Sequence, residues 1–250
     1  MKTKVWAHRG ASAYAPENTL EAFRLAEEQG ADGVELDVQL TLDGQLVVIH
    51  DETIERVSDG TGYVKDYTLE ELRAFHFNKT HPECKDGRIP TLEEVFSLLK
   101  PGNMTVNVEL KTGVIRYEGI EEKVLKLAKE TGMEDRVIYS SFHHPSLVKL
   151  KKLNPKVKTG LLYSDGWINV PKYAQKIGVD YLHPSMNHLK SAKLIKKCKE
   201  KHLGLHVWTV NDEEFMWYLV LNGIRAIITN VPDVCRRVVD ESKKTDSRKD

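Results

Sequence analysis

Two acidic residues and a histidine flank a predicted β-turn, and together they could bind a cation and transfer protons. Glu35 and Asp37 lie two residues apart in one strand-like run, and His50 ends the next run. Between the runs stands Asp43-Gly44, a strong signal for a two-residue hairpin turn. Such a turn would bring Asp37 opposite His50, and the alternation of side chains along a strand would place Glu35 on the same face. We therefore expect two carboxylates and an imidazole to meet at one point.

Other groups suited to acid–base chemistry or to anion binding end predicted strands. His8 and Arg9 end the first apolar run, and Glu109 and Lys111 lie two residues apart, on one face, in the strand at 104–111. Histidine changes charge near neutral pH, and arginine and lysine bind anions. The remaining candidates are His143, Tyr163, His183, and Trp208 with Asn211.

Several of these candidates have a structural interpretation of equal weight. We expect His183 and Trp208 to contact substrate, although a large aromatic side chain such as Trp208 could instead fill the interior of a barrel. His143 and His144 are more readily interpreted as structural residues. Surface or packing positions are expected for His76, His81, His188, His202 and His206.

The elements that must position these groups alternate between strand and helix along the chain. Strands are expected at 5–9, 33–42, 46–50, 104–111, 136–141, 157–163, 179–183, 205–209 and 225–229. The hairpin makes 46–50 antiparallel to its neighbour, so eight parallel strands remain. This pattern predicts an α/β fold, a (β/α)8 TIM barrel with a β-hairpin extension, whose catalytic groups lie at the carboxyl ends of the strands. An open doubly wound sheet is the alternative, but only His-Arg-Gly, and no glycine-rich phosphate fingerprint, follows the first strand.

One barrel domain is expected over residues 1–240, with a small inserted lobe at about 51–90. The lobe is polar and rich in turns, and it lacks a strong hydrophobic period. The last residues, 241–250, are rich in charge and are expected to form a flexible tail. Capping boxes predict four helix starts, at Asn18 with Glu21, Thr68 with Glu71, Thr91 with Glu94, and Asn211 with Glu214.

The bulk composition excludes several classes of protein. The 250 residues are 40% hydrophobic and 30% charged, with a formal net charge of zero and a pI near 7.2. A chain with zero net charge has no overall electrostatic attraction to polyanions, so we do not expect it to bind nucleic acid or to associate stably with an anionic membrane. Three cysteines without metal-type spacing argue against a disulfide framework, and no apolar run reaches signal-peptide or transmembrane length. We expect a soluble, cytoplasmic protein, with a homo-oligomer left open.

Seven short motifs occur in an order that resembles the glycerophosphodiester phosphodiesterase family. They are His8-Arg9-Gly10, Pro16-Glu17-Asn18-Thr19, Glu35-Leu36-Asp37-Val38, His50-Asp51, Pro90-Thr91-Leu92, Glu109-Leu110-Lys111 and Trp208-Thr209-Val210-Asn211. The resemblance extends to about Pro232 and implies a (β/α)8 barrel of the phosphatidylinositol-phospholipase-C-like type. The sequence departs from the family in the lobe, at Val57-Ser58 and at residues 75–78, away from the residues expected to carry the chemistry.

The resemblance also implies a role for each matching residue. Glu35, Asp37 and Glu109 would bind a divalent metal, His8 and His50 would act as acid and base, and Arg9 and Lys111 would contact the phosphate. Three carboxylates with no Cys or His at ligand spacing favour Mg²⁺ or Ca²⁺ over Zn²⁺. We expect His50 to be the base and His8 the acid, with the reverse left open.

The expected reaction is metal-dependent hydrolysis of a glycerophosphodiester, such as glycerophosphocholine or glycerophosphoethanolamine, to glycerol 3-phosphate and an alcohol. Attack by water and initial closure of a cyclic phosphate are both compatible with the sequence. A lysophospholipase D is an alternative, but it would need an apolar entrance that the sequence does not indicate. A barrel that only binds a polyol phosphate is a second alternative, although it would have no use for two histidines beside three acids.

Overall fold

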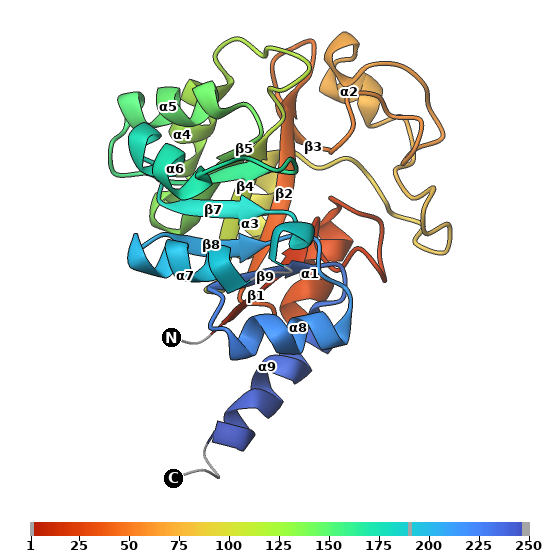
Figure 1. Cartoon of the computed structure of the whole chain (residues 1–250). Coiled ribbons are helices and arrows are strands. Elements are labelled where there is room, and N and C mark those ends of the chain that lie inside the picture. Colours follow the sequence, from red (N-terminus) through yellow and green to blue (C-terminus); the bar gives the residue numbers. More distant parts are fainter. Residues whose placement is uncertain (1–2, 190–191, 247–250) are drawn as a thin grey trace.

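Eight parallel strands close into a barrel in the computed structural model, which describes residues 3–189 and 192–246 (Figure 1). The strand order is β1-β9-β8-β7-β6-β5-β4-β2, and pairing of β1 with β2 closes the ring. This closure confirms the predicted (β/α)8 TIM barrel and excludes the open sheet. The strands are β1 Lys4–His8, β2 Gly33–Leu40, β3 Leu46–Val48, β4 Thr105–Leu110, β5 Val137–Ser141, β6 Lys158–Tyr163, β7 Tyr181–Pro184, β8 Gly204–Val207 and β9 Ala226–Thr229.

Most helices of the described residues surround the barrel and bury an apolar stripe against it (Figure 1). In α1, for example, the buried residues are Ala22, Phe23 and Ala26, at the three- and four-residue spacing of one helix face. The helices are α1 Leu20–Glu28, α2 Leu69–Leu72, α3 Leu92–Leu99, α4 Ile120–Glu130, α5 His144–Leu153, α6 Val170–Ile177, α7 Ala192–Glu200, α8 Glu213–Leu221 and α9 Pro232–Asp246. No helix of the described residues is long and apolar enough to cross a membrane.

Large side chains fill the inside of the barrel. Trp6, Ile138 and Ile228 form a cluster separate from the main core, and their strand neighbours face the helices instead. The imidazole of His206 packs against Trp6, with 4.4 Å between ring centroids. The interior is therefore a packed core and not a channel.

The β2–β3 hairpin is present, but its register differs by one residue from the predicted one. Val38 pairs with Val48, and the loop Leu42–Gly44 contains three residues, with Gly44 at φ +75°. A three-residue loop that ends in the left-handed region is the next most common hairpin connection. Asp37 consequently lies across from Ile49, whose N–H donates to the Asp37 carbonyl at 3.0 Å. The predicted cross-strand pair of Asp37 and His50 is wrong, because a one-residue slip moves every partner.

The segment 51–90 packs around an apolar cluster of its own, although its sequence lacks a hydrophobic period. This lobe lies beside β3, at the upper right of Figure 1, and includes α2. Both predicted capping boxes in and after the lobe, at Thr68 and Thr91, are confirmed. The cluster joins residues of the hairpin arm to residues of the lobe: Val47, Ile49, Ile54, Val57, Val64, Leu72, Phe77 and Ile89. The lobe therefore packs against β3 through apolar side chains that both segments bury in one cluster.

Beyond shifts of one or two residues at strand ends, two helix caps and the end of the last helix differ from the sequence prediction. The side chain that caps α1 belongs to Thr19, not Asn18, and the one that caps α8 belongs to Asp212, not Asn211. Helix α9 continues to Asp246, into the segment expected to be a flexible tail from 241, whereas 247–250 lie outside the described residues. The start expected for α7, at 191, also lies outside the described residues.

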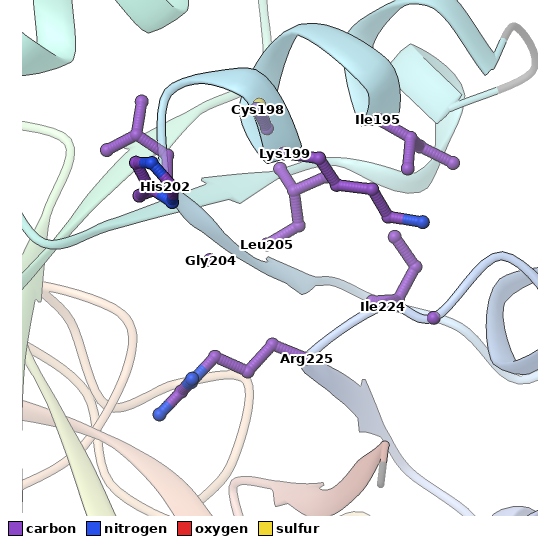
Figure 2. Close-up of a pocket in the computed structure, with 10 residues that line it drawn as sticks. Ile195, Cys198, Lys199, His202, Gly204, Leu205, Ile224 and Arg225 are labelled. Carbon is purple, nitrogen blue, oxygen red and sulfur yellow. The ribbon is translucent and has the colours of Figure 1, made fainter. Parts of the chain in front are cut away.

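A cavity of about 310 Å³ opens at the amino-terminal ends of β8 and β9, below α7 (Figure 2). Its walls are mainly apolar and include Ile195, Leu205 and Ile224. The nearby cations are engaged elsewhere, since Lys199 donates to the Asn222 carbonyl at 2.9 Å and Arg225 lies 5.3 Å from the centre of the Tyr181 ring. The cavity belongs to the end of the barrel opposite the catalytic face.

Two aspartates stabilise the same amino-terminal end by bonding to a neighbouring strand. Asp32 precedes β2 and accepts from Val5 N of β1 at 2.9 Å, and Asp180 precedes β7 and accepts from Thr159 N of β6 at 3.0 Å. Burial raises the pKa of Asp180, but the bonds from Lys151 and Thr159 outweigh it, so the pKa lies below its usual range. The ionised carboxylate is therefore favoured by folding.

Asp180→Asn should lower the free energy of unfolding at pH 7 by about 1–3 kcal/mol, the usual scale for hydrogen bonds to a charged group. Because the folded-state pKa is depressed, the stabilisation is complete above the unfolded-state pKa of about 3.9 and is lost as the pH falls through the folded-state value. Thermal unfolding of wild type and variant at pH 7 and at acid pH measures this. Asp135→Asn, at an exposed carboxylate, is the control. A difference between wild type and Asp180→Asn that persists undiminished in acid would contradict this account.

Candidate active site

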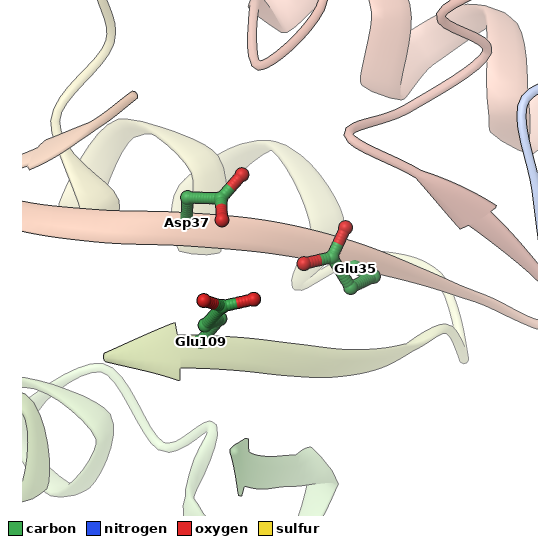
Figure 3. Close-up of side chains that lie close together, drawn as sticks. All are labelled: Glu35, Asp37 and Glu109. Atoms are coloured by element: carbon green, nitrogen blue, oxygen red, sulfur yellow. The ribbon is translucent and has the colours of Figure 1, made fainter. Parts of the chain in front are cut away.

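Three buried carboxylates converge on the inner face of the barrel, from two adjacent strands (Figure 3). Asp37 of β2 is in register with Glu109 of β4, and the two-residue period of β2 places Glu35 on the same face. One oxygen from each lies within 4.8 Å of the others, and side-chain exposure is at most 9%. The strand register, not a local motif, brings the acids together.

Two cations compensate part of this charge. Arg9 Nε lies 3.3 Å from Asp37 Oδ2, and Lys111 Nζ lies 3.2 Å from Glu109 Oε1. The side-chain amide of Asn18 also donates to Asp37 Oδ2, at 3.0 Å. Three negative and two positive groups leave the cluster with an excess negative charge.

The environment shifts the pKa values of the three carboxyl groups in different directions. Burial, followed by the charges of Asp37 and Glu109, raises the pKa of Glu35 well above its usual value. Burial also raises the pKa of Glu109, against the opposing effect of Lys111. For Asp37, burial is outweighed by Arg9 and the other nearby cations, so its pKa lies below its usual range. Repulsion is therefore concentrated on Glu35 and Glu109.

The donor set fits a hard divalent cation. Asp37 Oδ1 is buried and accepts no hydrogen bond from any described residue, and the Lys111 ammonium is 3.9 Å from it. Such an oxygen is costly to bury unless a cation or a donor meets it. All three side chains offer carboxylate oxygens, the ligands that Mg²⁺ and Ca²⁺ prefer. Glu35, Asp37 and Glu109 are thus the residues that would hold the metal.

His8 stands at the carboxyl end of β1 with one ring nitrogen fixed and the other facing the acids. Its Nδ1 is 2.7 Å from Asn230 Oδ1, an acceptor, so Nδ1 carries the proton. Its Nε2 is 3.9 Å from Glu35 Oε2. Burial and then the charge of Arg9 lower the pKa of His8 to about 4, although the bond to Asn230 opposes this. The ring is neutral at neutral pH, with a lone pair on Nε2.

The turn after His8 depends on close backbone packing. Arg9 adopts φ +57°, and its N–H donates to Glu35 Oε2 at 3.1 Å. Gly10 follows at φ +82°, where a Cβ would lie 2.6 Å from Ala22. Only glycine fits this approach to α1 without displacement. The His-Arg-Gly sequence therefore directs the arginine toward the acids.

His50 reaches the site from the bend after β3, and a buried side chain of β2 holds that bend. Gln39 Nε2 donates to the carbonyls of Ile49, His50 and Asp51 at 3.1, 3.1 and 2.7 Å. Tyr117 donates to Gln39 Oε1 at 2.8 Å, which fixes the orientation of the amide. These bonds replace the strand pairing that the sequence predicted for His50.

Asp51 orients the His50 ring. His50 Nδ1 is 2.5 Å from Asp51 Oδ1, so Nε2 is the nitrogen left for substrate. Burial raises the pKa of Asp51, but the bonds from Arg56 and His50 outweigh it and lower the pKa to about 2. Asp51 is therefore ionised at neutral pH.

Of the two other predicted substrate contacts, one lies at the mouth of the barrel and one does not. Trp208 is half-buried, donates from Nε1 to the His183 carbonyl at 2.7 Å, and packs against Phe142 with 5.5 Å between ring centroids. His183 has no exposed surface, and its Nε2 is 2.8 Å from His206 Nδ1 inside the barrel. The expectation that His183 contacts substrate is corrected, because its ring is enclosed by the barrel core.

The other histidines and Tyr163 have local structural partners. His143 Nδ1 lies 3.1 Å from Ser146 Oγ, and His144 Nε2 lies 2.9 Å from the Leu162 carbonyl. Tyr163 is buried beneath the ring of His188. None of these contacts involves the carboxylates.

Sequence reasoning missed the residues that hold the histidines and the acids. The sequence pattern predicts Asn18 only as a helix cap and predicts no separate role for Gln39 or Asp51. Asn230 directly follows the ninth strand, so its position at a strand end was an available signal. Its backbone N–H donates to Asn211 Oδ1 at 2.8 Å, so the two asparagines form one support for His8. For Gln39 the sequence offered no signal, because its partners are backbone carbonyls.

Comparison with known proteins gives concordant similarities over nearly the whole chain. The family model for the glycerophosphoryl diester phosphodiesterase family matches residues 8–234. A relative from Caldanaerobacter subterraneus subsp. tengcongensis, named glycerophosphodiester phosphodiesterase, is 46% identical over 240 residues, covering 96% of this chain and 98% of the relative. A phosphodiesterase structure from Oleispira antarctica in complex with the product sn-glycerol-3-phosphate has a TM-score of 0.87 at 29% identity. The match covers 96% of this chain and 97% of that chain. The glycerophosphodiester phosphodiesterase structure from Thermotoga maritima has a TM-score of 0.80 at 31% identity, and the match covers 95% of this chain and 99% of that chain.

Neutralising different acids of the cluster should have opposite effects on stability when no cation is present. Because the pKa of Glu35 is raised in the folded state, its ionised form destabilises the fold at neutral pH, and Glu35→Gln should raise or preserve the melting temperature in chelator. The pKa of Asp37 is depressed, so Asp37→Asn should lower the melting temperature by removing the partner of Arg9 and Lys111. Thermal unfolding in chelator measures both, with exposed Glu118→Gln as the control. Equal destabilisation by Glu35→Gln and Asp37→Asn would show that repulsion does not govern the cluster.

Proposed function

The chain belongs to the glycerophosphoryl diester phosphodiesterase family and is an enzyme of that kind, and we propose that it hydrolyses small glycerophosphodiesters to glycerol 3-phosphate and an alcohol. The observation that carries the proposal is the buried cluster of Glu35, Asp37 and Glu109 between two oriented histidines. The product bound to the relative from Oleispira antarctica supports glycerol 3-phosphate as the product here. Glycerophosphocholine and glycerophosphoethanolamine are the substrates we propose.

Cleavage of a phosphodiester requires that the negative charge of the phosphoryl oxygens be compensated. Arg9 and Lys111 border the carboxylate cluster, and we propose that they also contact the phosphate. A divalent cation held by Glu35, Asp37 and Glu109 would supply further neutralisation and Lewis acidity at a phosphoryl oxygen. We propose Mg²⁺ or Ca²⁺, because the donor set consists of carboxylates.

The two histidines are proposed to move the protons, in the opposite assignment to the one expected from the sequence. His8 is neutral with a lone pair on Nε2, which suits the base that takes the proton from the attacking oxygen. The bond from His50 Nδ1 to ionised Asp51 holds the ring so that Nε2 is left for substrate, and we assign to His50 the acid that gives a proton to the oxygen of the leaving alcohol. Trp208, at the barrel mouth, is proposed as a wall against the substrate.

A lysophospholipase D is the second candidate, and one observation favours it. Val114, Phe142 and Ile168 are exposed apolar side chains on the loops that follow β4, β5 and β6. These loops extend from the carboxyl ends of adjacent strands, the end that carries the acids. The sequence had indicated no apolar entrance, and these residues could contact an acyl chain. We prefer the smaller substrate because the groups at the cluster itself are polar.

The partners and location follow from the same reasoning. We propose a cytoplasmic enzyme that binds neither nucleic acid nor membrane stably, because a net charge of zero provides no attraction to polyanions. A homo-oligomer is compatible with this proposal.

The function is tested by incubation of the purified enzyme with glycerophosphocholine or with lysophosphatidylcholine. Enzyme stripped with a chelator should be inactive, and Mg²⁺ or Ca²⁺, added singly, should restore release of glycerol 3-phosphate, measured by a coupled dehydrogenase assay. Full activity in chelator would remove the cation from the mechanism. Faster cleavage of lysophosphatidylcholine would favour the second candidate.

Replacement of either proposed proton-transfer residue should reduce turnover with little change in KM. His8→Ala and His50→Ala should each lower kcat by about 10²-fold or more, the usual scale for loss of a general acid or base. His143→Ala should have a much smaller effect, because its ring bonds to Ser146. Steady-state kinetics with saturating cation measure all three variants. Similar, mild losses in all three would show that the histidines only position substrate.

A further inference from the structure

Arg56, a residue of the inserted lobe, joins two carboxylates that lead to different functional groups of the active site. Its Nη1 and Nη2 are each 2.8 Å from an oxygen of Glu17. Its Nε is 2.6 Å from Asp51 Oδ2, and Nη2 is 3.1 Å from Asp51 Oδ1. Both contacts are bidentate, so the guanidinium fixes the orientation of each carboxylate as well as its charge.

One of these carboxylates holds the His50 ring. Asp51 accepts from His50 Nδ1 at 2.5 Å, and its own two oxygens are both bonded to Arg56. A carboxylate with a single partner could rotate about its side-chain bonds, whereas one held from the opposite side by a planar fork cannot. The direction of His50 Nε2 is therefore set in part by Arg56, whose hydrogen bonds go to Asp51 and Glu17.

The other carboxylate holds the Arg9 guanidinium. Glu17 Oε1 accepts from Arg9 Nη1 at 2.9 Å, and the same oxygen accepts from Arg56. Arg9 then reaches Asp37 Oδ2 at 3.3 Å. The contacts form a continuous chain from the histidine to the metal-binding cluster: His50, Asp51, Arg56, Glu17, Arg9 and Asp37.

The backbone that carries Arg56 is anchored in the core of the lobe. Ile54 and Ser58 are fully buried, and Ser58 N and Oγ both donate to the Ile54 carbonyl, at 2.9 and 2.8 Å. Val57, next to Arg56, is buried in the same apolar cluster as Val47 of β3. Burial and hydrogen bonds thus hold the turn 54–58 in place. The lobe thereby fixes the position of Arg56, a role that its sequence does not indicate.

We propose that Arg56 is a positioning residue, through which the lobe sets the His50 ring and the Arg9 guanidinium relative to one another. The inference rests on the proposed function, since it treats His50 and Arg9 as working groups. An isolated surface ion pair would contribute little. Arg56 differs from such a pair because its two partners are mostly buried, with 15% of Glu17 and 27% of Asp51 exposed.

Arg56→Ala and Arg56→Lys, compared with Arg73→Ala, test the inference. Arg73 is a matched control on the same lobe, because it pairs with Glu94 at 2.6 Å and is 39% exposed, against 43% for Arg56. We expect Arg56→Ala to lower kcat by about 10–100-fold, the scale of a displaced catalytic group, with a melting temperature close to that of the control. Arg56→Lys should recover only part of the loss, because lysine cannot form the two planar contacts. A kcat equal to that of Arg73→Ala would overturn the inference.

A double variant tests whether Arg56 acts through Asp51. If it does, the losses caused by Arg56→Ala and Asp51→Asn should be less than multiplicative in the double variant, because only the contribution of Arg56 through Glu17 remains to be lost once Asp51 is replaced. If the activity loss of the double variant equals the product of the two single losses, Arg56 does not act through Asp51.

A spectrum recorded without substrate separates this inference from the proposed function. In ¹⁵N-histidine-labelled enzyme, the His50 Nδ1 proton bonded to Asp51 should broaden or shift in Arg56→Ala and stay unchanged in Arg73→Ala. An unchanged His50 signal in Arg56→Ala would overturn the positioning role. Failure of the wild-type enzyme to cleave glycerophosphodiesters would instead contradict the proposed function and leave the spectral result valid.

Discussion

Burial of three carboxylates within 4.8 Å of one another is the constraint on which the rest of the site depends. Like charges at this distance, removed from water, repel strongly, and the raised pKa values of Glu35 and Glu109 express that cost. Arg9 and Lys111 compensate only part of it. The closed barrel makes the arrangement tolerable, because a ring of eight hydrogen-bonded strands does not open to relieve local repulsion. The stability of the whole fold therefore maintains the carboxylate cluster.

The buried carboxylates and the histidines proposed to transfer protons lie in different parts of the barrel. The acids lie within β2 and β4, whereas the two histidines stand at strand ends or just beyond them. Each histidine has one nitrogen held by a side chain, Asn230 for His8 and Asp51 for His50, so that only Nε2 remains for chemistry. The supports differ in charge, because Asn230 is a neutral amide and Asp51 is an ionised carboxylate.

The inserted lobe extends this support beyond the barrel. Its apolar cluster shares Val47 and Ile49 with the hairpin arm, so the lobe and the bend that carries His50 are packed as one unit. Gln39 holds the same bend from inside the barrel through three backbone carbonyls. The bend is thus fixed from both sides, which compensates for the absence of strand pairing at His50.

The sequence by itself determined the barrel, the hairpin and the identity of the acids, because strand alternation, turn chemistry and two-residue spacing are local properties. It also placed Glu109 and Lys111 on one face, although not opposite Asp37. Only the tertiary structure decided the hairpin register, since Asp43-Gly44 is compatible with both two- and three-residue loops and the burial of one strand face specifies the register. Tertiary structure likewise enclosed His183 in the barrel core and turned Asn18 from a helix cap into a partner of Asp37. The contacts of Gln39, Asn230 and Arg56 join segments distant in sequence, and neither periodicity nor residue type encodes such contacts.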